Sequence, residues 1–135
     1  MKRTLLVALP LVLAVALTTT AFAGADKKDI QPTWQTEQVE ANLIAGVQSS
    51  NFGLRTSAAT MLSEFKTSKA VFALMGMLRN ESDERGRIVA ALALIKIGDP
   101  VGLYAVKQTG RLDGNVRVRK LCTLFYQEHE QEKQS

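Results

Sequence analysis

Residues 85–100 read RGRIVAALALIKIGDP, and this stretch decides the fold of the 135-residue chain. Two arginines open it, an almost wholly apolar run follows, and Gly-Asp-Pro closes it. Gly98 suits the left-handed end of a helix, and Pro100 stops that helix while suiting the first turn of the next one. The stretch therefore predicts a helix over about 85–97.

The same pattern recurs at a fixed offset of 32 residues on both sides of this stretch. Arg87 has equivalents at Arg55 and Arg119. The same offset, without a gap, matches Ala58, Ala90 and Cys122; Ala59, Ala91 and Thr123; Leu62, Leu94 and Tyr126; Phe72 and Tyr104; Ala73 and Ala105; Arg79 and Arg111; and Arg85 and Arg117. Adjacent small residues let one helix pack closely on another, and a large apolar residue one turn later fills the groove. The repeat predicts stacked helix pairs that share one continuous core.

Helical periodicity and turn residues predict six helices in all. They are expected at about 36–48, 53–65, 68–78, 85–97, 100–109 and 116–129, with a turn over 110–114. Ser82 or Asp83 can cap the start of the fourth helix, and Asn115 can cap the sixth. Because the connections are short, either a bundle or a solenoid would fit, and the internal repeat favours the solenoid.

The pattern x-R-x-x-A-A-x-x-L, followed by Gly-Asp-Pro, resembles HEAT repeats, particularly the short HEAT-like repeats also found in phycobilisome lyases. The middle repeat matches it with Arg87, Ala90-Ala91, Leu94 and Gly98-Asp99-Pro100. The first repeat keeps Arg55, Ala58-Ala59 and Leu62 but has Lys66-Thr67-Ser68 in place of Gly-Asp-Pro. The third departs at Cys122, Thr123 and Tyr126, as terminal capping units do.

This resemblance implies an all-α fold, a short right-handed α-solenoid of about three HEAT-like helical hairpins. The repeats are expected at about 36–65, 66–97 and 98–128, followed by a polar tail over 129–135. Fold does not imply function, so the resemblance gives no support for lyase activity.

The N-terminus has the pattern of a secretory signal peptide, expected over residues 1–23 and followed by a flexible linker over 24–35. Lys2 and Arg3 precede an apolar run over 5–17, and Ala21-Phe22-Ala23 offers a cleavage site after Ala23. The alternative is an uncleaved anchor, since residues 5–23 carry no charge and approach the length of a membrane span. The cleavage site and the threonines at 18–20 favour removal, which indicates a bacterial periplasmic or secreted protein without stable membrane insertion.

Charge and cysteine content narrow the classes of partner. Loss of Lys2 and Arg3 lowers the basic count from 17 to 15 against 13 acidic residues, a net charge of +2. A nucleic-acid-binding domain would usually be more basic, so nucleic acid is not expected as a partner. Cys122 is the only cysteine, which excludes an intrachain disulfide. Its apolar helical surroundings favour a buried core thiol over a reactive or interchain one.

The arginines allow two interpretations. Arg55, Arg87 and Arg119 are expected to bond to carboxylates or carbonyls in the loops of adjacent repeats, with Asp83, Asp99 and Asp113 as candidate partners. The alternative is a basic strip that binds an anionic partner in a salt-dependent way. That strip comprises Arg55, Arg85, Arg87, Arg117, Arg119 and Lys120, of which Arg117 and Lys120 are the least constrained by the repeat.

Ile88, Leu92 and Ile95 form a stripe on one face of the middle helix. The equivalent positions in the flanking repeats are mostly polar. If the stripe faces solvent it is a partner site, for another protein, a peptide or a second copy of the chain. If the central helix is buried on more sides than its neighbours, the stripe belongs to the core, and this interpretation is favoured for a helix that is apolar all round.

No catalytic, cofactor-binding or metal-binding motif is present in the sequence. His129 lies in the polar tail between two glutamates, and it is about two helical turns from Cys122, too far for a nucleophile–base contact. The sequence therefore predicts an exported, non-enzymatic protein-interaction scaffold without a cofactor. The alternative is an envelope protein that binds an anionic ligand through its arginine-rich face.

Overall fold

Six α-helices form the described part of the chain, with no strand among these residues. The computed structural model describes residues 33–135, with side chains from Thr36 onward. The helices are α1 (Thr33–Gly46), α2 (Phe52–Phe65), α3 (Val71–Asn80), α4 (Glu84–Ile97), α5 (Pro100–Leu112) and α6 (Val116–Glu132), and a 3₁₀ turn, Ser68–Ala70, precedes α3. The predicted signal peptide and most of the predicted linker lie outside these residues.

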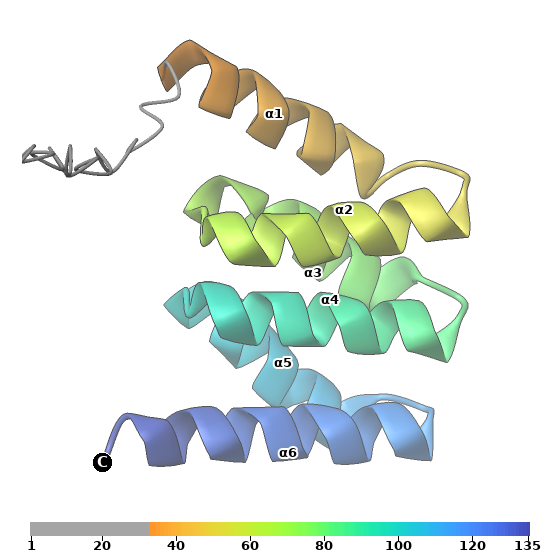
Figure 1. Ribbon diagram of the computed structural model, residues 1–135. Coiled ribbons are helices and arrows are strands. Elements are labelled where there is room, and N and C mark those ends of the chain that lie inside the picture. Colours follow the sequence, from red (N-terminus) through yellow and green to blue (C-terminus); the bar gives the residue numbers. More distant parts are fainter. Residues whose placement is uncertain (1–32) are drawn as a thin grey trace, which may run out of the picture. The chain divides into compact units, whose positions relative to one another are not determined.

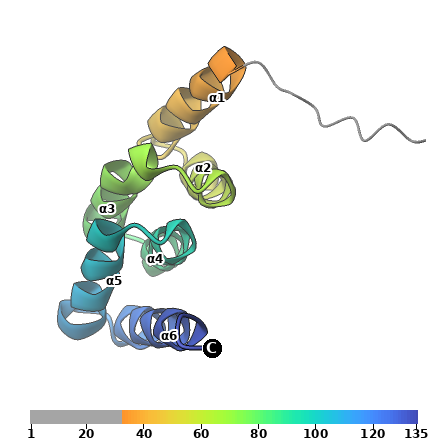
Figure 2. The ribbon, with the colours of Figure 1, turned by 90° about the vertical axis from the view of Figure 1, so that its left-hand side faces the viewer.

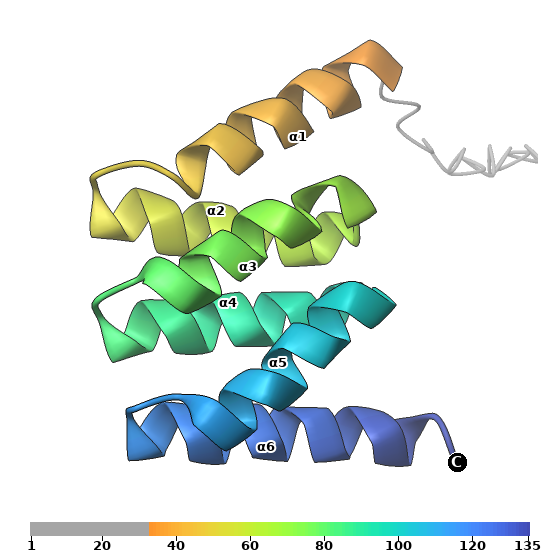
Figure 3. The ribbon, with the colours of Figure 1, turned by 180° about the vertical axis from the view of Figure 1, so that it is seen from behind.

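The helices form two layers. The B layer consists of α2, α4 and α6, which lie one above another (Figure 1). The A layer consists of α1, α3 and α5, which lie along one side of the B layer (Figure 2). From behind, α3 and α5 slope across the B-layer helices (Figure 3). Each A-layer helix and the B-layer helix that follows it form a hairpin, and three hairpins make the predicted short α-solenoid.

Every B-layer helix begins at a capping residue, and these residues follow the 32-residue offset. The side chain of Asn51 accepts a hydrogen bond from Leu54 N at 3.0 Å, Asp83 accepts one from Arg85 N at 2.9 Å, and Asn115 accepts one from Arg117 N at 2.8 Å. Each such cap stabilises a helix by about 1 kcal/mol because it satisfies a backbone amide that has no partner within the helix.

The core lies between the layers and contains the residues that the repeat singles out. The largest fully buried side chains are Leu62, Leu74, Leu94, Val106, Val118 and Cys122. Both small pairs, Ala58-Ala59 and Ala90-Ala91, are also buried, which allows α2 and α4 to pack closely. The buried position of Cys122 agrees with the core assignment made from the sequence.

Helix ends differ from the sequence prediction at several places. α5 continues to Leu112 through the turn expected over 110–114, because Gly110 serves close packing there. A Cβ on Gly110 would lie 2.8 Å from Thr123 Oγ1 on α6. α1 begins at Thr33 rather than near Thr36, and α6 extends beyond His129 to Glu132.

The ends of α2 and α4 have the same backbone geometry despite their different sequences. Gly98 ends α4 with φ of 74°, as predicted, and Lys66 ends α2 with φ of 50°. Lys66 therefore adopts the left-handed conformation without being glycine, which is uncommon for a residue with a Cβ. The two helices thus share a left-handed C-terminal end, although Lys66-Thr67-Ser68 stands in place of Gly-Asp-Pro and a 3₁₀ turn precedes α3.

Candidate partner-binding site

The three repeated arginines occupy equivalent, partly buried positions near the starts of the B-layer helices. Each donates to a backbone carbonyl six residues earlier, in the loop that enters its own helix. Arg55 Nη1 is 2.9 Å from Ser49 O, Arg87 Nη1 is 2.9 Å from Glu81 O, and Arg119 Nη1 bonds to Asp113 O. These bonds satisfy carbonyls that the turn leaves without backbone partners.

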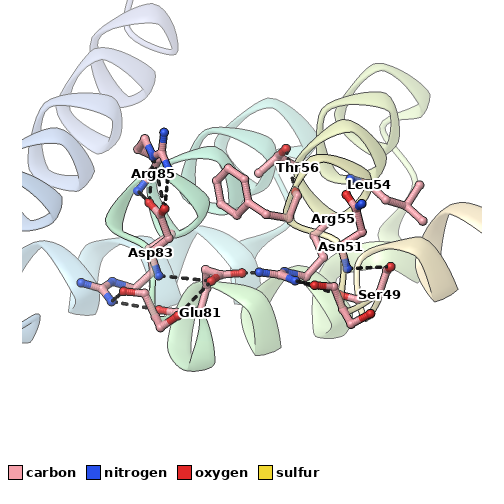
Figure 4. A network of polar contacts seen from close by, with 12 residues as sticks. Ser49, Asn51, Leu54, Arg55, Thr56, Glu81, Asp83 and Arg85 are labelled. Atoms are coloured by element: carbon pink, nitrogen blue, oxygen red, sulfur yellow. Dashed lines mark hydrogen bonds and ion pairs between the residues drawn. The ribbon is translucent and has the colours of Figure 1, made fainter.

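Two of these arginines also pair with a carboxylate 26 residues later, in the next hairpin. Arg55 Nε donates to Glu81 Oε2 at 2.7 Å, and Arg87 Nε lies 3.3 Å from Asp113 Oδ2. Figure 4 shows Arg55 and Glu81 joined in this way at the loop between α3 and α4. The hydrogen bond from Arg55 lowers the pKa of the Glu81 carboxyl. Each pair joins one repeat to the next, and we call this series the arginine ladder.

Of the three predicted carboxylate partners, the structure places only Asp113 against a repeated arginine. Asp83 pairs with Arg85 instead, at 2.6 Å, and Asp99 caps α5 by accepting from Val101 N at 2.8 Å. Sequence reasoning missed Glu81, although the 32-residue offset aligns it with Asp113. The equivalence is not obvious from the sequence, because one position is a glutamate and the other an aspartate.

The other members of the predicted basic strip are also largely engaged. Arg85 lies over the Phe52 ring, 5.1 Å from its centroid, in addition to its pair with Asp83. Arg117 Nη1 donates to Glu84 Oε1 at 3.1 Å. Lys120 is exposed, and among the described residues it forms no ion pair. Arg119 also lacks an ion pair among these residues, but it is partly buried and donates to Asp113 O. Lys120 is therefore the one exposed cation of the strip without an ion pair in the described part of the chain, which is a weak basis for binding an anionic ligand.

The predicted apolar stripe divides between core and surface. Ile88 and Ile95 are partly buried and pack against the core, whereas Leu92 is 40% exposed. On α6, Leu124 is equivalent to Leu92 and is 46% exposed. Leu92 and Leu124 occupy equivalent positions on α4 and α6, which pack against each other. They therefore form a row that runs from one helix to the next.

A groove of about 500 Å³ lies near the C-terminal ends of the B-layer helices. Leu92, Ile95 and Phe125 form its apolar part, and charged residues, including Glu64, Lys96 and Glu128, surround them. Lys96 Nζ donates to Glu64 Oε1 at 2.8 Å, which links α4 to α2. We call the surface formed by Leu92, Ile95, Leu124 and Phe125 the B-layer face. Sequence reasoning missed Phe125 because its equivalent in the middle repeat is the buried Ala93.

The residues considered for catalysis are not assembled into a reactive group. Cys122 is fully buried, and this burial raises the pKa of its thiol to about 11, so the nucleophilic thiolate is suppressed. His129 lies beside the end of α4, where a Cβ on Gly98 would be 3.9 Å from its Cε1. Among residues 33–135, no three His, Cys, Asp or Glu side chains are placed to hold a metal ion.

The family model for HEAT repeats matches residues 28–95. The chain belongs to the HEAT repeat family. The match ends within α4, and the third hairpin continues the same arrangement through its equivalent cap at Asn115 and its repeated arginine, Arg119. No curated protein matches the sequence. Within residues 33–135, no helix is both long and apolar enough to cross a membrane.

Proposed function

We propose that this chain is an exported, non-enzymatic scaffold that binds another protein or a peptide through its B-layer face. The observation that carries the proposal is the apolar row of Leu92 and Leu124, exposed on adjacent helices of the stacked unit. HEAT repeats typically mediate protein interactions, and stacked helical repeats provide extended surfaces for them.

The composition of the B-layer face fits a protein partner. Leu92 and Phe125 supply apolar area in the groove, and Leu124 adds exposed apolar area on α6. Apolar area stabilises a complex when it is removed from water. Charged residues of both signs border the groove, including Lys96 on α4 and Glu128 on α6. Charged borders of this kind orient a partner protein and speed its association more than they raise its affinity, as the polar rims of protein interfaces do.

Leu92→Asp tests the B-layer face. Because Leu92 is partly exposed, the variant is expected to remain folded, while a charge placed in the apolar contact weakens the complex by at least about tenfold. Tagged wild-type and variant proteins would be used to recover partners from an envelope extract, with bound proteins quantified by mass spectrometry. Solution mass would show whether the partner is a second copy of the chain.

Leu54→Asp is the matched control, since Leu54 is also an exposed leucine but lies on the side of α2 toward α1. A partner should bind to wild type and to Leu54→Asp and be lost with Leu92→Asp, with all three proteins equally helical by circular dichroism. If Leu92→Asp unfolds, the row belongs to the core. If it folds and retains every partner, the B-layer face is not the binding surface.

The proposed export rests on the N-terminal pattern of Lys2, Arg3 and the Ala21-Phe22-Ala23 cleavage site. We expect the full-length chain expressed in a bacterium to yield a mature protein that begins at Gly24. Intact mass and N-terminal sequencing of the periplasmic fraction and the culture medium would test this. Recovery of the uncleaved chain in the membrane fraction would instead support the anchor alternative.

A further inference from the structure

The A-layer helices α3 and α5 carry a second repeated arrangement of exposed side chains. Phe72 and Arg79 are seven residues apart on α3, and Tyr104 and Arg111 are their equivalents on α5. Residues seven apart lie on one face of a helix, about 10 Å apart along its axis. Phe72 is 75% exposed, Tyr104 is 63% exposed, and both arginines are exposed. Each helix therefore presents an aromatic ring and a guanidinium group on its outer side.

The arginines of this arrangement are not used by the fold. Among the described residues, neither Arg79 nor Arg111 forms an ion pair, unlike the arginines of the ladder. α3 and α5 together contain three basic side chains, Arg79, Lys107 and Arg111, and no acidic one. The outer side of these helices therefore carries uncompensated positive charge beside exposed aromatic rings.

A groove of about 400 Å³ separates α3 from α5. Arg79 from α3 and Tyr104 from α5 both line it, and much of its remaining lining is apolar, formed by Met75, Leu78, Ala105 and Leu112. Asp113 also lines the groove, but this carboxylate already pairs with Arg87 and accepts from Asn115 N at 2.8 Å. The charge left available in the groove is therefore positive.

The equivalent groove between α1 and α3 provides an internal comparison. Phe72 takes the place of Tyr104 there, and Glu81, paired with Arg55, takes the place of Asp113. Val47 stands where the α3–α5 groove has Arg79. Stacking alone thus produces a groove with an aromatic residue and a paired acid, but it does not require the free arginine.

We propose that the α3–α5 groove binds an acidic, apolar-containing segment of a partner protein. An apolar side chain of the segment packs beside Tyr104, and a carboxylate pairs with Arg79 in the groove. Arg111 does not line the groove, but it adds exposed positive charge near the end of α5. Arginine suits this role because its planar guanidinium group can donate two parallel hydrogen bonds to one carboxylate. The inference rests on the proposed scaffold function for its class of partner, but it concerns a different surface from the B-layer face.

The test uses a short fluorescent peptide in which glutamate alternates with leucine and phenylalanine, and a matched peptide with glutamine in place of glutamate. Binding to the mature chain would be followed by fluorescence anisotropy. Wild type is expected to prefer the acidic peptide, and Arg79→Gln to bind it about tenfold more weakly, since Arg79 supplies a charge-assisted hydrogen bond. Arg79→Gln/Arg111→Gln should bind both peptides equally weakly.

Lys120→Gln/Lys133→Gln is the charge-matched control, because both lysines are exposed on α6 or just beyond it. This variant should bind the acidic peptide like wild type. If both double variants bind the peptide equally weakly, the effect is one of net charge alone and the proposal is overturned. Arginine-dependent binding to phosphatidylglycerol vesicles without peptide binding would also overturn it, in favour of a lipid surface. Leu92→Asp should leave peptide binding unchanged, so this inference and the B-layer face can fail separately.

Discussion

Leu94→Ala is expected to lower the free energy of unfolding by about 3 kcal/mol, within the range of roughly 2–5 kcal/mol for buried leucines. Leu94 is fully buried in α4, whose neighbours in the stack are α2 and α6. Its Cδ2 also fits against α5, because a Cβ on Gly102 would be only 3.0 Å away. Truncation would therefore leave a cavity at the centre of the stack. Urea and thermal unfolding followed by circular dichroism would measure the loss.

Leu112→Ala is the control, since Leu112 is an exposed leucine at the end of α5. Its free energy of unfolding should differ from that of wild type by no more than about 0.5 kcal/mol, as for most surface substitutions. The midpoint of thermal unfolding of Leu94→Ala should fall by roughly 15 °C, given the usual shift per kcal/mol for a domain of this size. Equal effects of the two substitutions would contradict the placement of Leu94 at the centre of the core.

Glu81→Ala is expected to destabilise the fold by about 2 kcal/mol, because it leaves a partly buried arginine without its carboxylate. The Glu81 side chain is 5% exposed and that of Arg55 is 20% exposed. Glu81 also accepts from Asp83 N at 3.1 Å, so its loss loosens the loop that caps α4. Unfolding in urea would measure the effect.

The matched control is Glu64→Ala, which removes a glutamate whose ion pair with Lys96 is exposed. Exposed ion pairs contribute at most about 1 kcal/mol, so this variant should resemble wild type. If Glu81→Ala lowers the free energy of unfolding no more than Glu64→Ala does, the arginine ladder does not stabilise the contact between repeats.

The ladder also predicts how stability depends on pH. Arg55 lowers the pKa of Glu81 in the folded state below the usual value of 4.5, so the unfolded chain takes up this proton first as pH falls. The contribution of Glu81 is therefore complete above about pH 4.5 and is lost as pH falls through the folded pKa. Asp83 behaves in the same direction, with its pKa lowered to about 2 mainly by its hydrogen bond from Arg85.

Glu81→Gln should remove part of this acid sensitivity. Its stability should be lower than that of wild type at neutral pH, and the two curves should converge as the pH falls below 4.5. Identical slopes for the two proteins in that range would contradict the pairing of Glu81 with Arg55. Wild type and variant would be compared by urea unfolding at a series of pH values.

The repeat made the fold predictable because its physical requirements are local and periodic. Ala90 and Leu94 mark close packing within one helix, and Asp83 and Gly98 mark its ends, so each could be recognised from spacing alone. The partner of Arg55 could not be recognised in this way, because Glu81 lies in another hairpin and its side chain is longer than that of its equivalent, Asp113. Pairing between hairpins depends on how the hairpins stack, which periodicity does not specify.

The candidate surfaces were less predictable because exposure depends on the neighbouring layer. Ile88, Leu92 and Ile95 form one stripe in the sequence, yet only Leu92 is exposed. The offset also matched Phe72 with Tyr104 and Arg79 with Arg111, without showing that these residues lie on the outer side of the A layer. Gly110 suggests a turn in the sequence but serves helix packing in the structure, because glycine permits turns and close helix packing alike.

Hydrogen exchange of the protein, with and without a partner recovered by wild type, tests the proposed B-layer face most directly. Amides of α4 and α6 near Leu92 and Leu124 should exchange more slowly in the complex, because the partner covers both helices. The amides of α1 should be unaffected. Protection restricted to the A layer, or a complex that protects neither α4 nor α6, would contradict the assignment of this face as the binding surface.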